Sequence, residues 1–137
     1  MWGKKLLCEF DKIENVKICA CINKSKNIDW FNSNYPKINL TDNYKDVLRD
    51  ESIDAVVIAT PNKTHYEIVT EAIEAQKHIF IEKPVTLSSK EAKDLINLKS
   101  KKILFINHIF LFNACFKFLK DKLHRKKIRS IKMVWNK

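Results

Sequence analysis

The chain has 137 residues, of which 45% are hydrophobic, so it is long enough for one folded domain and too apolar to be disordered. Lysine and arginine outnumber aspartate and glutamate by 26 to 16, which gives a formal charge of +10. Because the lysines are scattered among asparagine and isoleucine along the whole chain, biased composition explains them, and we expect no nucleic-acid partner.

The four cysteines indicate neither a metal site nor disulfides. Cys8, Cys19, Cys21 and Cys115 include no CxxC pair and no histidine at metal-ligand spacing, so we interpret them as small apolar side chains and expect no metal. The first residues lack the apolar segment of a signal peptide. The longest nearly apolar run, residues 103–112, is too short to span a bilayer. We therefore expect a cytoplasmic protein with no membrane partner.

Apolar spacing along the chain predicts alternating helices and strands. Helices are expected over residues 4–13, 29–35, 64–76 and 113–123, with two more after the capping groups at 41–43 and the capping box of Ser88 and Glu91. Compact apolar runs predict strands at 16–22, 38–40, 53–60, 77–82 and 103–106, and alternation predicts a last strand at 128–135. This order predicts an α/β fold, a doubly wound parallel sheet covered on both faces.

One of these strands ends in charged groups. The run 77–82 stops at Glu82, Lys83 and Pro84, which is how a buried parallel strand delivers polar groups to a site. A lysine held there can donate hydrogen bonds or pass a proton. Lys83 is therefore the first candidate for chemistry, and an exposed strand-end lysine without a role is the alternative.

Four short motifs follow one another along the chain. Residues 54–62 read DAVVIATPN, residues 64–66 read THY, residues 82–84 read EKP, and His108 precedes the pair FN at 112–113. In this order and at these spacings they resemble the Gfo/Idh/MocA family of NAD(P)-dependent oxidoreductases. The segment around residues 110–113 looks most like the members that act on sugars and nucleotide sugars.

The resemblance implies a Rossmann domain that binds NAD or NADP and a second domain that completes the substrate pocket. It implies that Lys83 is catalytic, contacting substrate and nicotinamide ribose and assisting proton transfer, while Glu82 orients that lysine or binds ribose. Thr64 is expected to cap the helix that follows it. Cofactor contacts are implied for Trp2, Gly3, Asn23, Thr60, Pro61, Asn62, His65, Glu82 and Lys83, and substrate contacts for Lys83, His108 and Asn113.

The resemblance to the family also predicts that the sheet lacks its central strand. Gly3 corresponds to the third glycine of the phosphate-binding turn, which permits close packing of helix on strand. The first strand, central in the order 3-2-1-4-5-6, and the first two glycines are absent from the sequence. We expect either a gap in the sheet or direct pairing of 16–22 with 53–60. Asn23 stands at the position where an acid usually holds the ribose of the cofactor. An asparagine there favours tolerance of NADP.

Residues 1–125 are thus expected to form an incomplete NAD(P)-binding Rossmann-like domain, and residues 126–137 to begin a truncated substrate domain. Two functions stay open at this point. The first is an oxidoreductase that transfers hydride to or from a sugar or nucleotide-sugar substrate. The second is a catalytically inactive remnant, or half of a split protein, that binds no cofactor alone.

Overall fold

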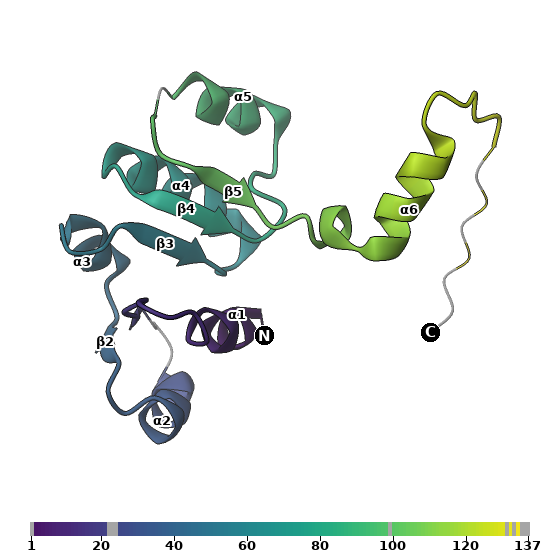
Figure 1. The fold of residues 1–137 in the computed structure, drawn as a ribbon. Helices are drawn as coiled ribbons and strands as arrows, with labels where there is room; N and C mark the ends of the chain where they lie inside the picture. The colour runs from purple at the N-terminus through teal and green to yellow at the C-terminus, as the bar shows by residue number, and fades with distance from the viewer. Residues whose placement is uncertain (1, 22–24, 99, 131, 133, 135–137) are drawn as a thin grey trace. The chain divides into compact units, whose positions relative to one another are not determined.

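A computed structural model shows the expected alternation of helices and strands (Figure 1). The structure describes residues 2–21, 25–98, 100–130, 132 and 134. The chain divides into two compact units, Met1–Asn107 and His108–Lys137. The α/β class is confirmed, and the domain boundary expected at 125/126 stays a prediction.

The first unit opens with a helix and a small sheet. Its elements are α1 (Trp2–Phe10), β1 (Cys19–Cys21), α2 (Ser25–Asn34) and β2 (Asn39–Thr41). The strands β1 and β2 pair in parallel, with Cys19 opposite Asn39 and Cys21 opposite Thr41. β1 is shorter than the apolar run 16–22 because β2 offers only these three residues for backbone pairing.

A larger parallel sheet occupies the rest of this unit. Its strands are β3 (Ala55–Ile58), β4 (His78–Ile81) and β5 (Leu104–Ile106), in the order β3-β4-β5. Their connections contain the 3-10 turn η1 (Asn62–Thr64) and the helices α4 (His65–Glu74) and α5 (Ser89–Asn97), and α3 (Tyr44–Arg49) precedes β3. In register, Ile58 lies opposite Ile81, and Ile81 lies opposite Ile106.

The expected gap in the sheet is confirmed. No ladder joins β1 to β3 in the described part of the chain, so the alternative of direct pairing is not adopted. One edge of β3 pairs with β4, and the opposite edge has no strand partner among the described residues. β3 therefore presents an open backbone edge of the kind that most proteins cover.

Helices lie on both faces of the larger sheet, although Val57 and Phe105 on the second face are 43% and 37% exposed. The core joins residues of α3, β3, α4, β4 and α5, namely Leu48, Ile58, Val69, Ala72, Ile73, Ile79, Ile81 and Leu95. On the other face Phe10 of α1 meets Phe80 edge to face, with ring centroids 5.5 Å apart. Phe80 also stacks on Phe105, with centroids 5.2 Å apart. This two-sided cover confirms the doubly wound arrangement.

Two predicted helix caps are present. The Asn43 side chain accepts a hydrogen bond from the backbone N–H of Lys45 at the start of α3. At the start of α5 the capping box forms as expected, because Ser88 Oγ accepts from the Glu91 N–H and Glu91 Oε2 accepts from the Ser88 N–H. These local signals fix where both helices begin.

The second unit contains η2 (Ile109–Phe112) and α6 (Ala114–Leu123), the latter as predicted. The strand predicted at 128–135 is wrong for residues 128–130, 132 and 134, which lie in no strand. Residues 131, 133 and 135 lie outside the described residues. A strand needs a neighbour for its backbone groups, and the described part of this unit contains none. No described helix is long and apolar enough to cross a membrane.

Candidate functional site

The candidate site lies at the carboxyl ends of β3 and β4. The pairing of these strands runs one residue past each, because the Glu82 N–H donates to Ile58 O at 3.1 Å and the Asn107 N–H donates to Ile81 O at 2.8 Å. Parallel strands bring the residues that follow them to one edge of the sheet, where ligands bind in open α/β folds. The loops 59–64 and 82–88 therefore start from neighbouring points.

His65 connects the two loops. Its side chain is fully buried, with 0% of the residue exposed. Nδ1 lies 2.7 Å from Pro84 O, and Nε2 lies 2.9 Å from Thr60 O. Both ring nitrogens are thus occupied by backbone carbonyls, and the role that the geometry gives this ring is to hold the loops. Direct contact between His65 and a cofactor stays a prediction.

Thr60, Pro61 and Asn62 are exposed at the end of β3. The expected cap by Thr64 is wrong, because its side chain makes no capping hydrogen bond to α4. Its Oγ1 lies 2.8 Å from both Pro61 O and Thr60 Oγ1 instead. The 3-10 turn brings these groups within reach, and a hydroxyl has a single proton to donate. Thr64 therefore stabilises the turn that presents Thr60 and Asn62.

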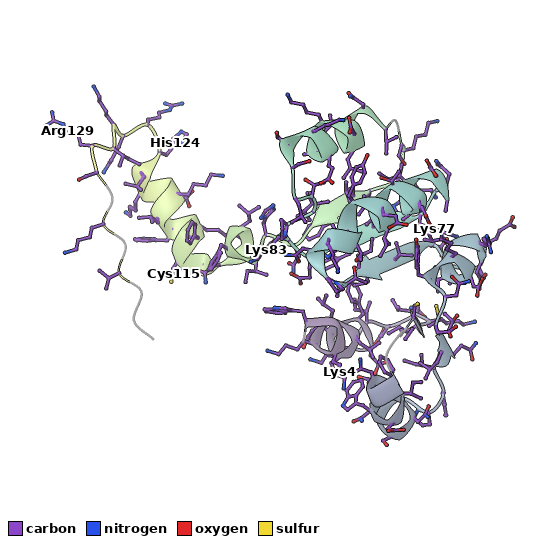
Figure 2. All side chains as sticks on the ribbon, turned by 180° about the vertical axis from the view of Figure 1, so that it is seen from behind. Lys4, Lys77, Lys83, Cys115, His124 and Arg129 are labelled. Carbon is purple, nitrogen blue, oxygen red and sulfur yellow. The ribbon has the colours of Figure 1, made fainter. Side chains whose placement is uncertain are left out.

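Lys83 and Glu82 make different contacts although they are neighbours. Glu82 is half-buried, and its Oε1 accepts a hydrogen bond from Asn107 Nδ2 at 2.7 Å. Lys83 is exposed and forms no ion pair within the described chain (Figure 2). Glu82 thus orients Asn107 rather than Lys83, and the Lys83 ammonium is available to a ligand.

Sequence reasoning missed the contact of Asn107 with Glu82. The register of β4 and β5 contains the signal that could have found it, because Ile81 pairs with Ile106 and the next residues are Glu82 and Asn107. An acid and an amide placed directly after two adjacent parallel strands are expected to meet.

Trp2 and Gly3 lie in the first turn of α1, and Trp2 is 52% exposed. A Cβ built on Gly3 would lie 3.7 Å from the Cβ of Ala59, so α1 approaches the end of β3 closely. This agrees with a glycine at a helix-to-strand contact, although 3.7 Å is an ordinary contact distance that alanine could also adopt. Asn23 lies outside the described residues.

His108 and Asn113 belong to the second unit. His108 is exposed and precedes η2. Asn113 is also exposed, and its Oδ1 accepts a hydrogen bond from the Phe116 N–H at 3.2 Å, which caps α6. The structure thus gives Asn113 a local role in starting a helix. The substrate-binding role of both residues stays a prediction.

Other reactive groups do not add to the site. Burial raises the pKa of the Cys19 thiol and of the Cys21 thiol, which keeps both in the less nucleophilic protonated form. Among the described residues, no group of three His, Cys, Asp or Glu side chains could hold a metal ion. The chemistry at the strand ends therefore depends on the Lys83 ammonium and on hydroxyl and amide groups.

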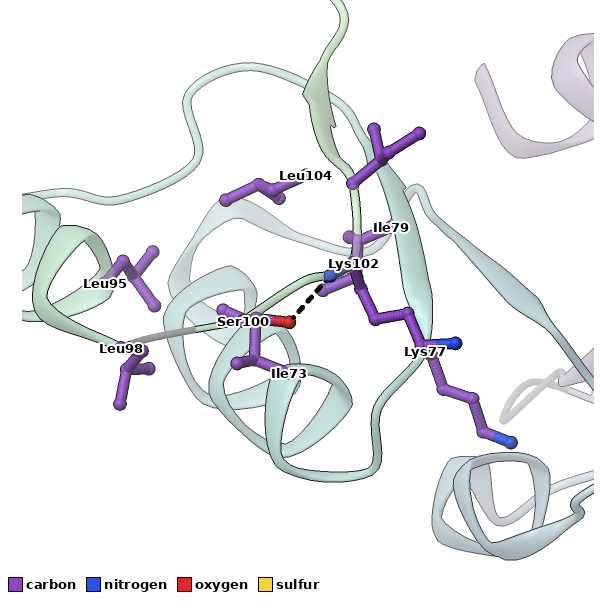
Figure 3. A pocket seen from close by; sticks show the side chains of 9 residues that line it. Ile73, Lys77, Ile79, Leu95, Leu98, Ser100, Lys102 and Leu104 are labelled. Carbon is purple, nitrogen blue, oxygen red and sulfur yellow. Dashed lines mark hydrogen bonds between the residues drawn. The ribbon is translucent and has the colours of Figure 1, made fainter.

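The best-defined hollow of the first unit lies away from this edge. It is a cavity of about 170 Å³ beside the amino ends of β4 and β5, lined mainly by apolar side chains of α4, α5 and both strands, together with Lys77 and Lys102 (Figure 3). The Lys77 ammonium is occupied by backbone carbonyls of Asp50 and Ile53. This cavity thus lies at the amino ends of the strands, whereas the candidate site lies at their carboxyl ends.

Comparison with known families gives an extensive match. A family model described as "Oxidoreductase family, NAD-binding Rossmann fold" (GFO_IDH_MocA) matches residues 3–108. An uncharacterized oxidoreductase of Bacillus subtilis (strain 168), YrbE, is 36% identical over 96 residues, which cover 69% of this chain and 28% of YrbE. The scyllo-inositol 2-dehydrogenase (NAD(+)) of the same strain is 52% identical over 48 residues, covering 35% of this chain and 14% of that protein.

A solved structure shows the same similarity. The crystal structure of an NAD-binding protein from Listeria innocua superimposes with a TM-score of 0.79 and 25% identity, over 93% of this chain and 38% of that chain. This chain therefore spans well under half the length of the proteins it resembles.

Proposed function

Because the chain belongs to the GFO_IDH_MocA oxidoreductase family, whose domain is an NAD-binding Rossmann fold, we propose that its strand-end edge binds the nicotinamide half of NAD or NADP. In this proposal Lys83 assists the transfer of a hydride from a hydroxyl-bearing carbon of a sugar-like substrate, or the reverse transfer to the corresponding carbonyl carbon. The same lysine would contact both substrate and nicotinamide ribose, and this chain is an N-terminal part of such an oxidoreductase.

The observation that supports this proposal is the availability of Lys83. Its ammonium is exposed without an ion pair in the described chain, while its neighbour Glu82 is bound to Asn107 and its loop is attached to His65. A fixed loop that presents one free charged donor is the arrangement needed to bind a hydroxyl or carbonyl oxygen in a set orientation.

The residues at this edge fit the nicotinamide half of a dinucleotide. Thr60, Pro61 and Asn62 are exposed beside the end of β3, where their polar groups are accessible to a ligand. When bound, the nicotinamide accepts or donates the hydride. During reduction the Lys83 ammonium can donate a proton to the carbonyl oxygen. During oxidation Lys83 first releases its own proton to solvent, and the neutral amine then takes the proton of the substrate hydroxyl.

The substrate class is supported by a relative and by the motif at residues 110–113. The scyllo-inositol 2-dehydrogenase acts on a ring polyol, so we propose a polyol or sugar substrate with a secondary hydroxyl. We also propose a cytoplasmic location, supported by four cysteines that are all free thiols in the structure.

The alternative function is a chain that cannot bind cofactor by itself. The gap between β1 and β3 favours it, because the central part of a dinucleotide-binding sheet is where the pyrophosphate binds. In that case the chain would act as one half of a larger assembly.

A fluorescence titration separates these possibilities. Purified chain is titrated with NADH and with NADPH while nicotinamide emission is followed. We expect saturable binding of at least one of them, and about 10- to 100-fold weaker binding by Lys83→Met, the loss of one hydrogen bond from a charged donor. Lys90→Met, which changes an exposed lysine of α5, is the matched control and should bind as the wild type does.

No saturable binding at millimolar concentrations of either cofactor would reject the oxidoreductase proposal for this chain and favour the alternative. Equal binding by wild type and Lys83→Met would remove Lys83 from the cofactor site.

A further inference from the structure

We infer that His65 is a positioning residue that carries a proton on each ring nitrogen and thereby holds the loop after β3 and the loop after β4 at a fixed separation. The geometry of the ring supports this. Nδ1 and Nε2 lie 2.7 and 2.9 Å from Pro84 O and Thr60 O. Both partners are backbone carbonyl oxygens, which only accept hydrogen bonds.

A neutral imidazole cannot satisfy both partners. It has one N–H, and its second nitrogen presents a lone pair. In the neutral ring, one lone pair would face a carbonyl oxygen at hydrogen-bond distance, which is repulsive. A ring protonated on both nitrogens donates to Thr60 O and to Pro84 O at once, which accounts for both short distances.

Because His65 is buried, its two ring nitrogens depend on these protein partners for hydrogen bonds. His65 has no exposed surface, so solvent does not compete for either nitrogen. It is also the first residue of α4, where the helix dipole disfavours a cation. No carboxylate forms an ion pair with His65 in the described chain, since Glu82 is bound to Asn107. The two carbonyl dipoles are therefore the groups that stabilise its charge.

The ring sets the spacing of the candidate site. Thr60 begins the exposed segment after β3, and Pro84 directly follows Lys83. A rigid aromatic ring between their carbonyls fixes how far Lys83 can lie from Thr60 and Asn62. This consequence for ligand binding rests on the proposed function, whereas the double hydrogen bond does not.

His78 provides an internal reference in the same unit. Its Nδ1 accepts a hydrogen bond from the Ile103 N–H at 3.1 Å, so that nitrogen carries no proton. His65 and His78 are thus expected to differ in whether Nδ1 carries a proton, and a single experiment can measure this.

The test is a long-range proton–nitrogen NMR spectrum of the ¹⁵N-labelled full chain at neutral pH, with ring signals assigned from His65→Gln and His78→Gln. We expect each ring nitrogen of His65 to show a one-bond coupling to a slowly exchanging proton, and Nδ1 of His78 to show none. A one-bond coupling at only one nitrogen of His65 would overturn the double donation. The spectrum itself is recorded on wild-type protein, and where a variant fails to fold the ring signals are assigned by through-bond correlation to the backbone amide of each histidine.

Amide hydrogen exchange tests the positioning role. In His65→Gln, exchange of the Glu82 amide, the last bond of the ladder between β3 and β4, should accelerate about tenfold or more, while the Phe80 amide within β4 should not change. The control His78→Gln should leave Glu82 exchange unaltered. An unchanged Glu82 amide in His65→Gln would reject the positioning role.

Adding NADH to the same wild-type sample keeps the two proposals apart. Shifts of the Thr60 and Asn62 amides without loss of the His65 ring protons support both. An intact pair of ring protons with no response to NADH rejects the proposed function and leaves the inference about His65 standing.

Discussion

Replacing Lys77 by methionine should destabilise the first unit strongly. Lys77 is only 6% exposed, and its Nζ donates to Asp50 O and to Ile53 O, each at 2.7 Å. Asp50 ends α3, so the ammonium also lies at the negative end of that helix. One side chain therefore ties the end of a helix and the start of β3 to the start of β4.

The size of the loss follows from these two bonds. A hydrogen bond from a charged donor contributes about 1.5–3 kcal/mol. Asp50 O keeps a second partner, since the Ile53 N–H also donates to it at 3.1 Å, so the lower value applies to that bond and the sum of the two bonds is about 3 kcal/mol or more. Methionine retains the apolar stem and adds no bulk to the neighbouring cavity (Figure 3). The change thus isolates the ammonium.

Urea unfolding at neutral pH, followed by far-ultraviolet circular dichroism, measures the effect. Lys102→Met is the matched control, because Lys102 lines the same cavity and its ammonium has no hydrogen-bond partner among the described residues. We expect Lys77→Met to lower the free energy of unfolding by about 3 kcal/mol and Lys102→Met to change it by less than about 0.5 kcal/mol. A loss below about 1 kcal/mol in Lys77→Met would refute the reasoning.

Three smaller effects are expected in the same assay. Gly3→Ala should stabilise the chain by about 0.4–1 kcal/mol, because the added Cβ meets only an ordinary contact at 3.7 Å and α1 loses a flexible residue. Ser88→Ala removes the N-terminal cap of α5 and should cost about 1 kcal/mol, whereas Ser89→Ala, inside the helix, should cost less. The hydrogen bond from Lys45 holds the pKa of Glu71 below its ordinary 4.5, so this pair stabilises the fold above that pH and the contribution is lost on acidification. Glu71→Gln should therefore show a smaller fall in stability between neutral pH and a pH below 4.5.

The fold could be predicted largely from local signals. Apolar spacing located the helices around residues 64–76 and 113–123, and the Ser88 capping box marked the start of α5 because both partners lie within one turn. The strand predicted at 128–135 from alternation is wrong for the described residues there, because alternation describes a surface suited to pairing and supplies no partner. β1 is shorter than the apolar run 16–22 for a related reason, because β2 pairs with only three of its residues.

Sequence reasoning found the residues of the candidate site more readily than their contacts. Lys83 was identified because polar residues directly after a buried parallel strand lie at the sheet edge, whereas Thr60 was implied by the resemblance to the family. The buried role of His65 could not be predicted, because it depends on a carbonyl 19 residues away that comes near only when β3 pairs with β4. The bond of Glu82 to Asn107 spans 25 residues and likewise requires the strand register.

The contacts that order the strand-end edge are independent of the gap in the sheet. His65 joins the loops after β3 and β4, Asn107 fixes Glu82, and the ladder between these strands extends past them, so all these contacts lie among residues that follow β3, β4 and β5. A partner strand in the gap would cover the open edge of β3 without altering any of these bonds. The nicotinamide half of the proposed site is therefore preorganised in this chain, and the energetic cost of completing the site falls on the half that holds the pyrophosphate and adenosine.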